Sequence, residues 1–444
     1  MTRPVLILSA VGLSVALVVG IGAFGPGLVD GADSAGAPSV SRPEPESLLA
    51  GEAAPGGLAA TISSLQSRLR EARDDWRSYA SLGLAYLQQA RITADPSFYD
   101  KAEGVLRRSL ELKGSGNYEA LLGLGSLAAT RHDFSGALEW GRRAKSVDPY
   151  SAEARGLIGD ALIELGRYRA GVSAYQDMID LRPGLSAYAR VSYARELTGD
   201  TKGAIAAMKL ADQAATGSPH DGAWVGYQLG ELHFGQGRLD QARRAYAKGA
   251  ALAPDYLLNT AGLAKIAAAR GHHARAASLL ESVVAQYPSP ELLILAGDVN
   301  SLAGRHAKAR EMYELVRVTE RLYAAGGVDT DLEMALFNAD HGVALGDALA
   351  DARAQYRKRP SILVADALAW TLYANGRYDA ARRKATEALR LGTKSALLNY
   401  HAGMIAFRGG RAAEARRHLA EALALNPDFS FIHADSARST LARL

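Results

Sequence analysis

The chain has 444 residues, of which 48% are hydrophobic, 22% are charged and none is cysteine. The lack of cysteine excludes disulfides, thiol catalysis, thiolate metal sites and a lipidated cysteine. The formal net charge is only +4, and no basic run or basic-aromatic cluster stands out, so we expect no binding of nucleic acid.

The N-terminus carries an uncharged stretch, residues 5–24, that follows Arg3 and the α-amino group. Twenty helical residues span about 30 Å, the thickness of the hydrocarbon core of a bilayer. A secretory signal has a shorter apolar region and a clear small-residue cleavage site, so the pattern favours an uncleaved transmembrane anchor within residues 1–25. The preceding positive charge predicts a single-pass protein of the cytoplasmic membrane, with its N-terminus inside and its body outside. A cleaved, secreted form is the alternative.

A linker and a helix are expected to follow this stretch. Residues 26–57 are rich in Gly, Pro, Ser and Ala, a composition that buries little apolar surface and is typical of a disordered tether. Residues 58–75 carry Ile62, Leu65 and Leu69 at helical spacing, which predicts an amphipathic capping helix.

From residue 76 to residue 430 the sequence repeats itself. A glycine recurs with a small residue five positions later, at Gly166/Gly171, Gly199/Ala204, Gly237/Ala242, Gly271/Ala276, Gly304/Ala309, Gly376/Ala381 and Gly410/Ala415. Pro149 and Pro183 are 34 residues apart, as are Pro254 and Pro288. A fixed period of this length is typical of a solenoid, in which each unit packs only on its neighbours.

Each unit fits a pair of helices. Small residues at positions 8 and 20 allow the two helices to approach closely, and bulky residues at positions 4, 7, 11 and 24 fill the space around them. Glycine at position 15 suits a tight turn, and proline at position 32 ends the second helix. The unit that starts at Ala223 has Gly237, Ala242, Tyr246 and Pro254 at these positions.

These residues resemble the tetratricopeptide repeat, from about Trp76 to about Ser430, and the chain resembles bacterial, membrane-anchored members of unassigned role. The resemblance implies an all-α fold: a right-handed superhelical solenoid of about ten helical hairpins over residues 76–430, preceded by the transmembrane helix and ended by a capping helix at residues 431–444. The units are expected to start near Trp76, Tyr118, Ala152, Leu185, Ala223, Leu257, Pro290, Asp329, Ile362 and Ala396.

The resemblance also implies a binding surface. In such arrays the first helices line a concave groove, and positions 2, 5, 9 and 12 face it. The partner-binding groove predicted in this way consists of Tyr193, Trp224, Tyr227, Glu231, Phe234, Phe337, Asp340, Asp366, Trp370, Tyr373, Tyr400 and Phe407, with Glu153, Asp160, Glu196, Lys265, Asp298 and Glu333 as further charged members. Rigid aromatic rings are preferred anchors at interfaces, so we expect the groove to bind a peptide or a partner helix. The alternative is that these rings only pack against neighbouring units.

No pattern in the chain predicts catalysis. There is no nucleophile elbow, no H-E-x-x-H metal motif and no phosphate-binding glycine loop, so we expect no enzyme activity, no cofactor and no metal. The polar run Asn338–Gly342 interrupts the eighth unit, and its Asn338 or Asp340 either holds an ion or a polar ligand or, as we expect, hydrogen-bonds a helix end in a weakened unit. The sequence therefore predicts a non-enzymatic scaffold for protein–protein interaction. The alternatives are a secreted adaptor or assembly chaperone and, less expected, an enzyme acting on cell-envelope polymers.

Overall fold

The computed structural model describes residues 55–444, which fold into 22 helices without a strand. The all-α solenoid predicted from the repeats is confirmed for this part of the chain. The predicted membrane segment 5–24 lies outside the described residues, as does the predicted linker 26–57 up to its last three residues. Among the helices of residues 55–444, none combines the length and the apolar character needed to cross a bilayer.

Twenty of the 22 helices pair into ten consecutive hairpins, which we number one to ten in chain order. The hairpins are α3 (Trp76–Thr93) with α4 (Ser97–Leu112), α5 (Tyr118–Thr130) with α6 (Phe134–Val147), α7 (Ala152–Glu164) with α8 (Tyr168–Leu181), α9 (Leu185–Leu197) with α10 (Thr201–Ala214), α11 (Pro219–Phe234) with α12 (Leu239–Leu252), α13 (Leu258–Ala269) with α14 (His273–Val284), α15 (Pro290–Leu302) with α16 (His306–Ala325), α17 (Asp331–His341) with α18 (Leu345–Lys358), α19 (Ile362–Ala374) with α20 (Tyr378–Ala388), and α21 (Ala396–Arg408) with α22 (Ala412–Leu425). The helices α2 (Pro55–Glu71) and α23 (Ala434–Leu441) flank this series.

The turn inside most hairpins is made by glycine in the left-handed region. The seven glycines that the sequence places at position 15 have φ between 65° and 78°, as predicted. At Gly166 the turn closes with two backbone hydrogen bonds, from Gly166 to the carbonyl of Ile163 (2.9 Å) and from Arg167 to that of Leu162 (2.8 Å). This pair of bonds satisfies the last carbonyls of α7. In hairpin two, His132 takes the same conformation without glycine (φ 61°).

Close packing within a hairpin depends on the small residue at position 8. A Cβ atom added to Gly230 would overlap the ring of Tyr246, which is fully buried. Gly159 stands in the same relation to Tyr175 in hairpin three. The predicted pairing of a small residue with a bulky one sixteen positions later is therefore confirmed, because the ring fills the space that the missing side chain leaves.

The departures from the repeat follow from local sequence. In hairpin one the carboxylate of Asp95 accepts a hydrogen bond from the backbone N–H of Ser97 (2.9 Å), which fixes the turn just before α4, whose N-cap is Pro96. The helix α16 continues for 20 residues to Ala325 and ends at Gly326. Hairpin eight has the short first helix α17, of 11 residues, because Gly342 ends it with φ 66°.

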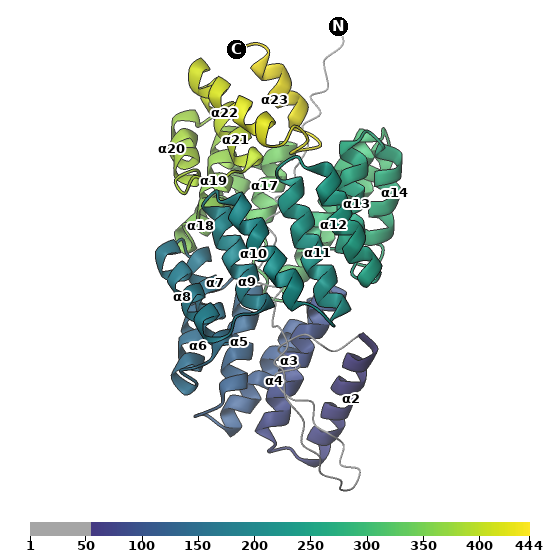
Figure 1. Ribbon diagram of the computed structural model, residues 1–444, viewed down its shortest axis with the longest axis vertical. Coiled ribbons are helices and arrows are strands. Elements are labelled where there is room, and N and C mark those ends of the chain that lie inside the picture. The colour runs from purple at the N-terminus through teal and green to yellow at the C-terminus, as the bar shows by residue number, and fades with distance from the viewer. Residues whose placement is uncertain (1–54) are drawn as a thin grey trace.

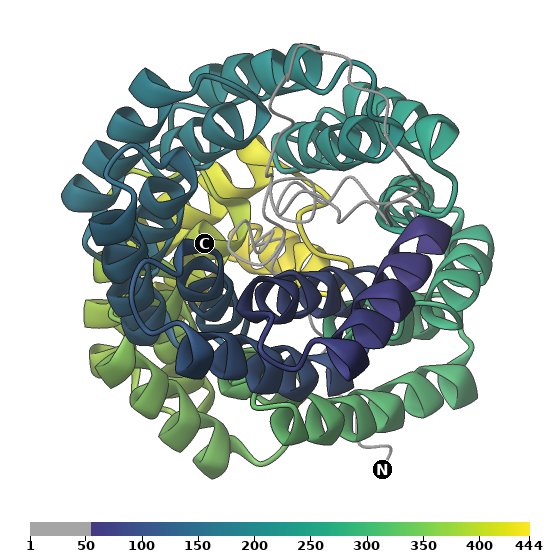
Figure 2. The same cartoon turned by 90° about the horizontal axis from the view of Figure 1, so that it is seen from below.

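Successive turns of the superhelix touch one another. The turn inside a hairpin contacts the segment that precedes the first helix six hairpins further on. Arg131 Nε donates to the carbonyl of Gly326 (3.0 Å), and the backbone N–H of Ile362 donates to the hydroxyl of Tyr168 (2.6 Å). Viewed along the long axis, the helices form a ring around a central space, while the side view shows the stacked turns (Figures 1 and 2). The concave side is thereby enclosed rather than left as an open groove.

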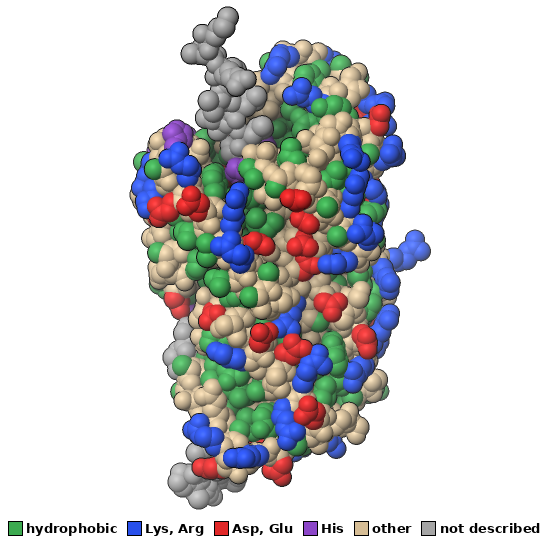
Figure 3. Space-filling model, turned by 180° about the vertical axis from the view of Figure 1, so that it is seen from behind, with side chains coloured by type: hydrophobic (Ala, Val, Ile, Leu, Met, Phe, Trp, Pro, Cys, Tyr) green, Lys and Arg blue, Asp and Glu red, His purple; other side chains and the backbone are tan. Residues whose placement is uncertain are grey.

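The apolar core is spread along the whole array. Separate buried clusters lie in hairpins one to three, four and five, six and seven, and eight to ten. On the outer face shown in Figure 3, basic and acidic side chains are interspersed, with apolar ones between them. That face therefore has no extended field of a single sign.

Candidate functional site

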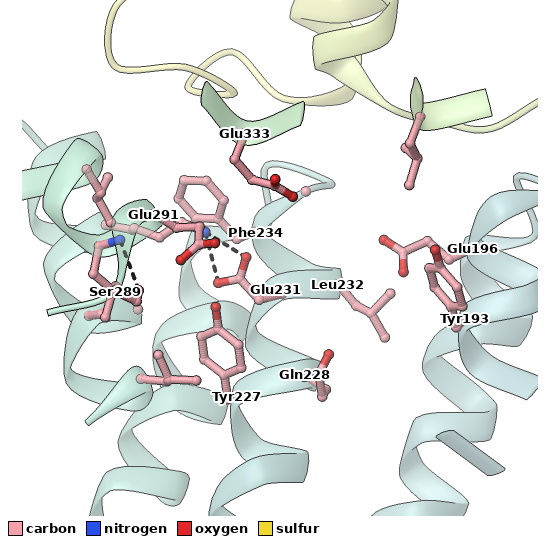
Figure 4. Close-up of a pocket in the computed structure, with 18 of the residues that line it drawn as sticks. Tyr193, Glu196, Tyr227, Gln228, Glu231, Leu232, Phe234, Ser289, Glu291 and Glu333 are labelled. Carbon is pink, nitrogen blue, oxygen red and sulfur yellow. Dashed lines mark hydrogen bonds and ion pairs between the residues drawn. The ribbon is translucent and has the colours of Figure 1, made fainter. Parts of the chain in front are cut away.

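The interior of the superhelix contains a cavity of about 430 Å³. Its wall is built mainly by the first helices of the hairpins, among them α3, α9, α11, α13, α15, α17 and α21. This size falls within the range typical of ligand pockets, roughly 300–1,000 Å³. Figure 4 shows part of the wall, with α9 and α11 facing one another across open space. We call the residues that line this cavity, together with the side chains that bind them, the interior site.

A buried ion pair joins hairpins five and six at the cavity wall. Lys265 Nζ lies 2.8 and 2.7 Å from the two carboxylate oxygens of Glu231, as the dashed lines in Figure 4 mark. The hydroxyl of Tyr246 donates to the same carboxylate (2.5 Å), and the ring of Phe234 lies 4.4 Å from the ammonium. A charge removed from water needs such partners, so this pair fixes the two hairpins to each other.

The same arrangement recurs two hairpins earlier. Asp160, at the equivalent position of hairpin three, accepts a hydrogen bond from Tyr175 (2.9 Å). Arg190 of hairpin four binds Asp160 with two nitrogens, at 2.9 and 2.7 Å. Both charged side chains are buried. An acid at position 9 therefore links its own second helix to the next hairpin.

In hairpin seven the acid is held differently. Asp298 accepts a hydrogen bond from Tyr313 (2.8 Å), and His341 Nε2 lies 3.7 Å away. Burial raises the pKa of Asp298 to about 7, although His341 and Tyr313 oppose that rise. Burial lowers the pKa of His341, but the bond and charge of Asp298 outweigh it, so the pKa is raised overall. The pKa of Asp298 therefore lies close to neutral pH.

Three further carboxylates line the cavity, those of Glu196, Glu291 and Glu333. Burial, followed by repulsion from Glu231, raises the pKa of Glu196 to about 7. Burial and the neighbouring Glu333 likewise raise the pKa of Glu291. Glu196 and Glu291 keep accessible surface, but it faces the cavity, which protein surrounds. Among the described residues, no Lys, Arg or His forms an ion pair with Glu196, Glu291 or Glu333.

The chain's own C-terminal segment, residues 427–433, occupies another part of the interior. His433 Nε2 lies 2.9 Å from Asp340 Oδ1, and its Nδ1 lies 3.2 Å from the hydroxyl of Tyr400. Trp370 Nε1 donates to the same oxygen of Asp340 (2.6 Å). Burial lowers the pKa of His433, which favours the neutral ring. The neutral ring can donate to Asp340 and accept from Tyr400, so both of its nitrogens are used.

Aromatic rings complete this contact. The indole of Trp370 is 3% exposed and stacks on His401 (4.2 Å between centroids) and on Tyr373 (4.5 Å). His401 Nδ1 lies 2.9 Å from Asp366. Hairpins eight to ten therefore present a layer of rings and acids on which the C-terminal segment rests.

The C-terminal segment also closes one end of the cavity. Phe431 lies against Phe234 (6.4 Å between centroids) and Phe429 against Tyr400 (5.3 Å). Both Phe429 and Phe431 belong to the cavity wall, together with Asn426 just before the segment. The open volume is thus bounded by this chain's own residues at that end.

The residues predicted to form a groove separate into four sets. The cavity wall contains Tyr193, Tyr227, Glu231 and Phe234. The layer beneath the C-terminal segment contains Asp340, Asp366, Trp370, Tyr373 and Tyr400. Trp224 and Phe337 are buried in core clusters, and Phe407 is half-buried near the end of α21. A role of any of the twelve in partner binding stays a prediction.

Some residues of the interior site were not identified from the sequence. Glu291 lies at position 2 of the seventh unit, as Trp224 does in the fifth, so the repeat did carry a signal for it. Gln228 lies one residue after Tyr227, at a position that the repeat does not assign to the interior. Phe431 and His433 follow the last repeat, where no periodicity exists to place them.

Metal chemistry finds no support in the described residues, where no three His, Asp or Glu side chains come together with metal-binding geometry. In the polar run of hairpin eight, His341 Nδ1 lies 2.8 Å from the carbonyl of Phe337, and Asp340 is bound by Trp370 and His433. These polar groups therefore bind the backbone or other side chains of the same chain.

Comparisons with known proteins agree with the repeat. A family model described as Tetratricopeptide repeat matches residues 97–152, 157–219 and 367–428, and a second model of the same description matches residues 234–298. Together the matches cover more than half of the chain. A search of curated protein sequences found no match.

Several solved structures are similar to the chain. The Cut9–Hcn1 hetero-tetramer of the APC/C matches with 14% identity and a TM-score of 0.42 over 90% of each chain. Human IFIT1, solved as a dimer with PPP-AAAA, matches with 13% identity and a TM-score of 0.47 over 76% of this chain and 79% of its own. A thermophilic tetratricopeptide protein of Thermus thermophilus, TTC0263, matches with 22% identity and a TM-score of 0.37 over 46% of this chain and 98% of its own.

Proposed function

Because the chain belongs to the tetratricopeptide repeat family, we propose that it is a non-enzymatic scaffold that holds an extended segment of a partner protein inside its superhelix. Members of this family generally mediate protein–protein interactions. The observation that carries the proposal is the interior cavity of about 430 Å³, walled by the first helices of successive hairpins. The half-buried ring of Tyr227 would supply contact area there at little cost in side-chain entropy.

The proposal also includes a cellular location for the scaffold. Residues 5–24 would anchor the protein in the cytoplasmic membrane of a bacterium, and residues 26–54 would tether the solenoid outside it. A set of alkaline-phosphatase fusions together with N-terminal sequencing of the purified protein tests this arrangement. We expect active fusions after residue 55 and an intact N-terminus. An intact N-terminus without phosphatase activity would contradict the topology, and a new N-terminus beyond residue 24 would favour the secreted adaptor.

Site-specific photo-crosslinking tests the interior binding. A benzophenone amino acid replaces Tyr227 in the cavity wall or, as the matched control, Tyr150, which is 81% exposed on the outside. We expect illumination in the source cells to give a discrete partner adduct from position 227 and none from position 150. Adducts of equal yield from both positions would contradict binding inside the superhelix.

A further inference from the structure

We infer that the interior site holds its partner segment through a lysine or arginine side chain, which pairs with Glu291 and Glu333. This inference rests on the proposed function and adds the chemical class of the partner. It is carried by the juxtaposition, within residues 55–444, of two carboxylates that form no ion pair and an amide nitrogen without a hydrogen-bond partner in the same cavity.

The two carboxylates lie close enough to repel each other. Glu291 extends from the start of α15 and Glu333 from α17, and both line the cavity (Figure 4). Glu333 Oε2 is shut off from solvent and has no hydrogen-bond partner among the described residues. The cation Lys265 of the same cavity is already paired with Glu231, so its charge is largely used there. An ammonium or guanidinium group would neutralise the pair and satisfy the open oxygen.

An independent observation comes from Gln228 on α11. This side chain is 5% exposed and lines the cavity, and its Nε2 has no hydrogen-bond partner among the described residues. Leaving a buried amide group without a hydrogen-bond partner is unfavourable. The backbone carbonyl of a bound peptide is an acceptor that would satisfy it. A free amine has no such acceptor, so Gln228 favours a peptide as the carrier of the cation.

The surroundings suit an organic cation better than a metal ion. Tyr287 and Tyr323 both line the cavity and lie near enough to Glu291 for its charge to act on them. Aromatic rings attract ammonium and guanidinium groups and pack against their aliphatic stems. No three metal-ligating side chains are brought together in the described residues. The combination of acids and rings therefore selects Lys or Arg.

The test uses fluorescence anisotropy with the full chain and three pools of fluorescein-labelled octapeptides, whose fixed centres are Lys-Lys, Ser-Ser and Glu-Glu. The double variant Glu291→Gln/Glu333→Gln removes the acids with little change of shape. The matched control is Glu139→Gln/Glu314→Gln, which removes equal charge from exposed residues outside the cavity. Thermal melting of each variant checks the fold.

We expect the Lys-Lys pool to bind the wild type and the control about tenfold or more tightly than the Ser-Ser pool does, and the double variant to lose that preference. The Gln228→Leu variant should weaken all pools alike. Equal binding of the three pools to the wild type would overturn the basic partner but leave the scaffold function standing. Displacement of the Lys-Lys pool by 1,5-diaminopentane at equal concentration would overturn the inference that a peptide carries the cation. Failure of every pool to bind would contradict the proposed function itself.

Discussion

Phe234 and Asn426 are 192 residues apart in the chain, yet Asn426 Nδ2 donates a hydrogen bond of 2.8 Å to the backbone carbonyl of Phe234. The bond joins the turn of hairpin five to the start of the C-terminal segment. It is buried, and a second bond from the backbone of Asp428 to Asn426 Oδ1 (2.9 Å) orients the amide. One side chain thus connects two turns of the superhelix and the closed end of the cavity.

Replacing Asn426 by Ala should destabilise the protein by about 1–3 kcal/mol, because the carbonyl of Phe234 loses its buried donor. Hydrogen exchange should also become faster in α23. The control is Asn375→Ala, which removes an amide-to-carbonyl bond of 2.8 Å between Asn375 and Leu345 of the preceding hairpin. The control should lose comparable stability without faster exchange in α23. Unchanged hydrogen exchange of α23 in the Asn426→Ala variant would contradict the role of Asn426 in holding the C-terminal segment.

A second prediction separates backbone strain in the turn of a hairpin from contact between successive turns of the superhelix. Gly199 and Gly271 both have φ of 78°, so replacement by Ala strains both backbones equally. A Cβ at Gly199 would in addition overlap the carbonyl of Gly392, whereas a Cβ at Gly271 meets no atom within 4 Å. Gly199→Ala should therefore cost about 1–3 kcal/mol more than Gly271→Ala in urea denaturation. Equal losses in the free energy of unfolding would mean that successive turns of the superhelix do not touch at Gly199.

The sequence predicted those features that depend only on contacts within one repeat unit. Gly166 and Tyr246 could be placed because a left-handed turn and a ring opposite glycine depend only on residues of the same unit. Contact between Gly199 and Gly392 could not be predicted, since it depends on small rotations that add up over six hairpins. The candidate site shows the same division. Glu231 was assigned to the interior, but its pairing with Lys265 required the geometry between neighbouring units.

The buried pair of Glu231 and Lys265 gives a third prediction. Lys265→Met leaves Glu231 buried without its cation, which should cost about 3–5 kcal/mol. The double variant Lys265→Met/Glu231→Gln should recover much of that loss, because the amide carries no charge and still accepts from Tyr246. Chemical denaturation of the four proteins of this cycle measures the coupling. A double variant no more stable than Lys265→Met would contradict the account of the pair.

The fourth prediction concerns pH. The pKa of Asp298 rises from an ordinary 3.8 to about 7 in the folded protein, so the folded state binds more protons than the unfolded chain between these values. The raised pKa of His341 acts in the same direction. Their contribution to stability is therefore full at low pH and is lost as pH rises through about 7. Asp298→Asn should flatten this part of the stability curve between pH 5 and pH 8, measured by urea denaturation. An unchanged slope in Asp298→Asn would contradict the assignment.

The enclosure of the interior by touching turns is the claim on which the site depends, and cross-linking measures it most directly. Gln236 of one turn of the superhelix donates to the carbonyl of Lys394 of the next (3.5 Å); Lys394 is exposed and Gln236 is half-buried. The natural chain has no cysteine, so Gln236→Cys/Lys394→Cys carries only the two introduced thiols. We predict that a short bismaleimide joins them within the monomer in high yield, while each single variant stays uncross-linked. Two thiols that react with a monofunctional maleimide but do not become joined would contradict the closed superhelix.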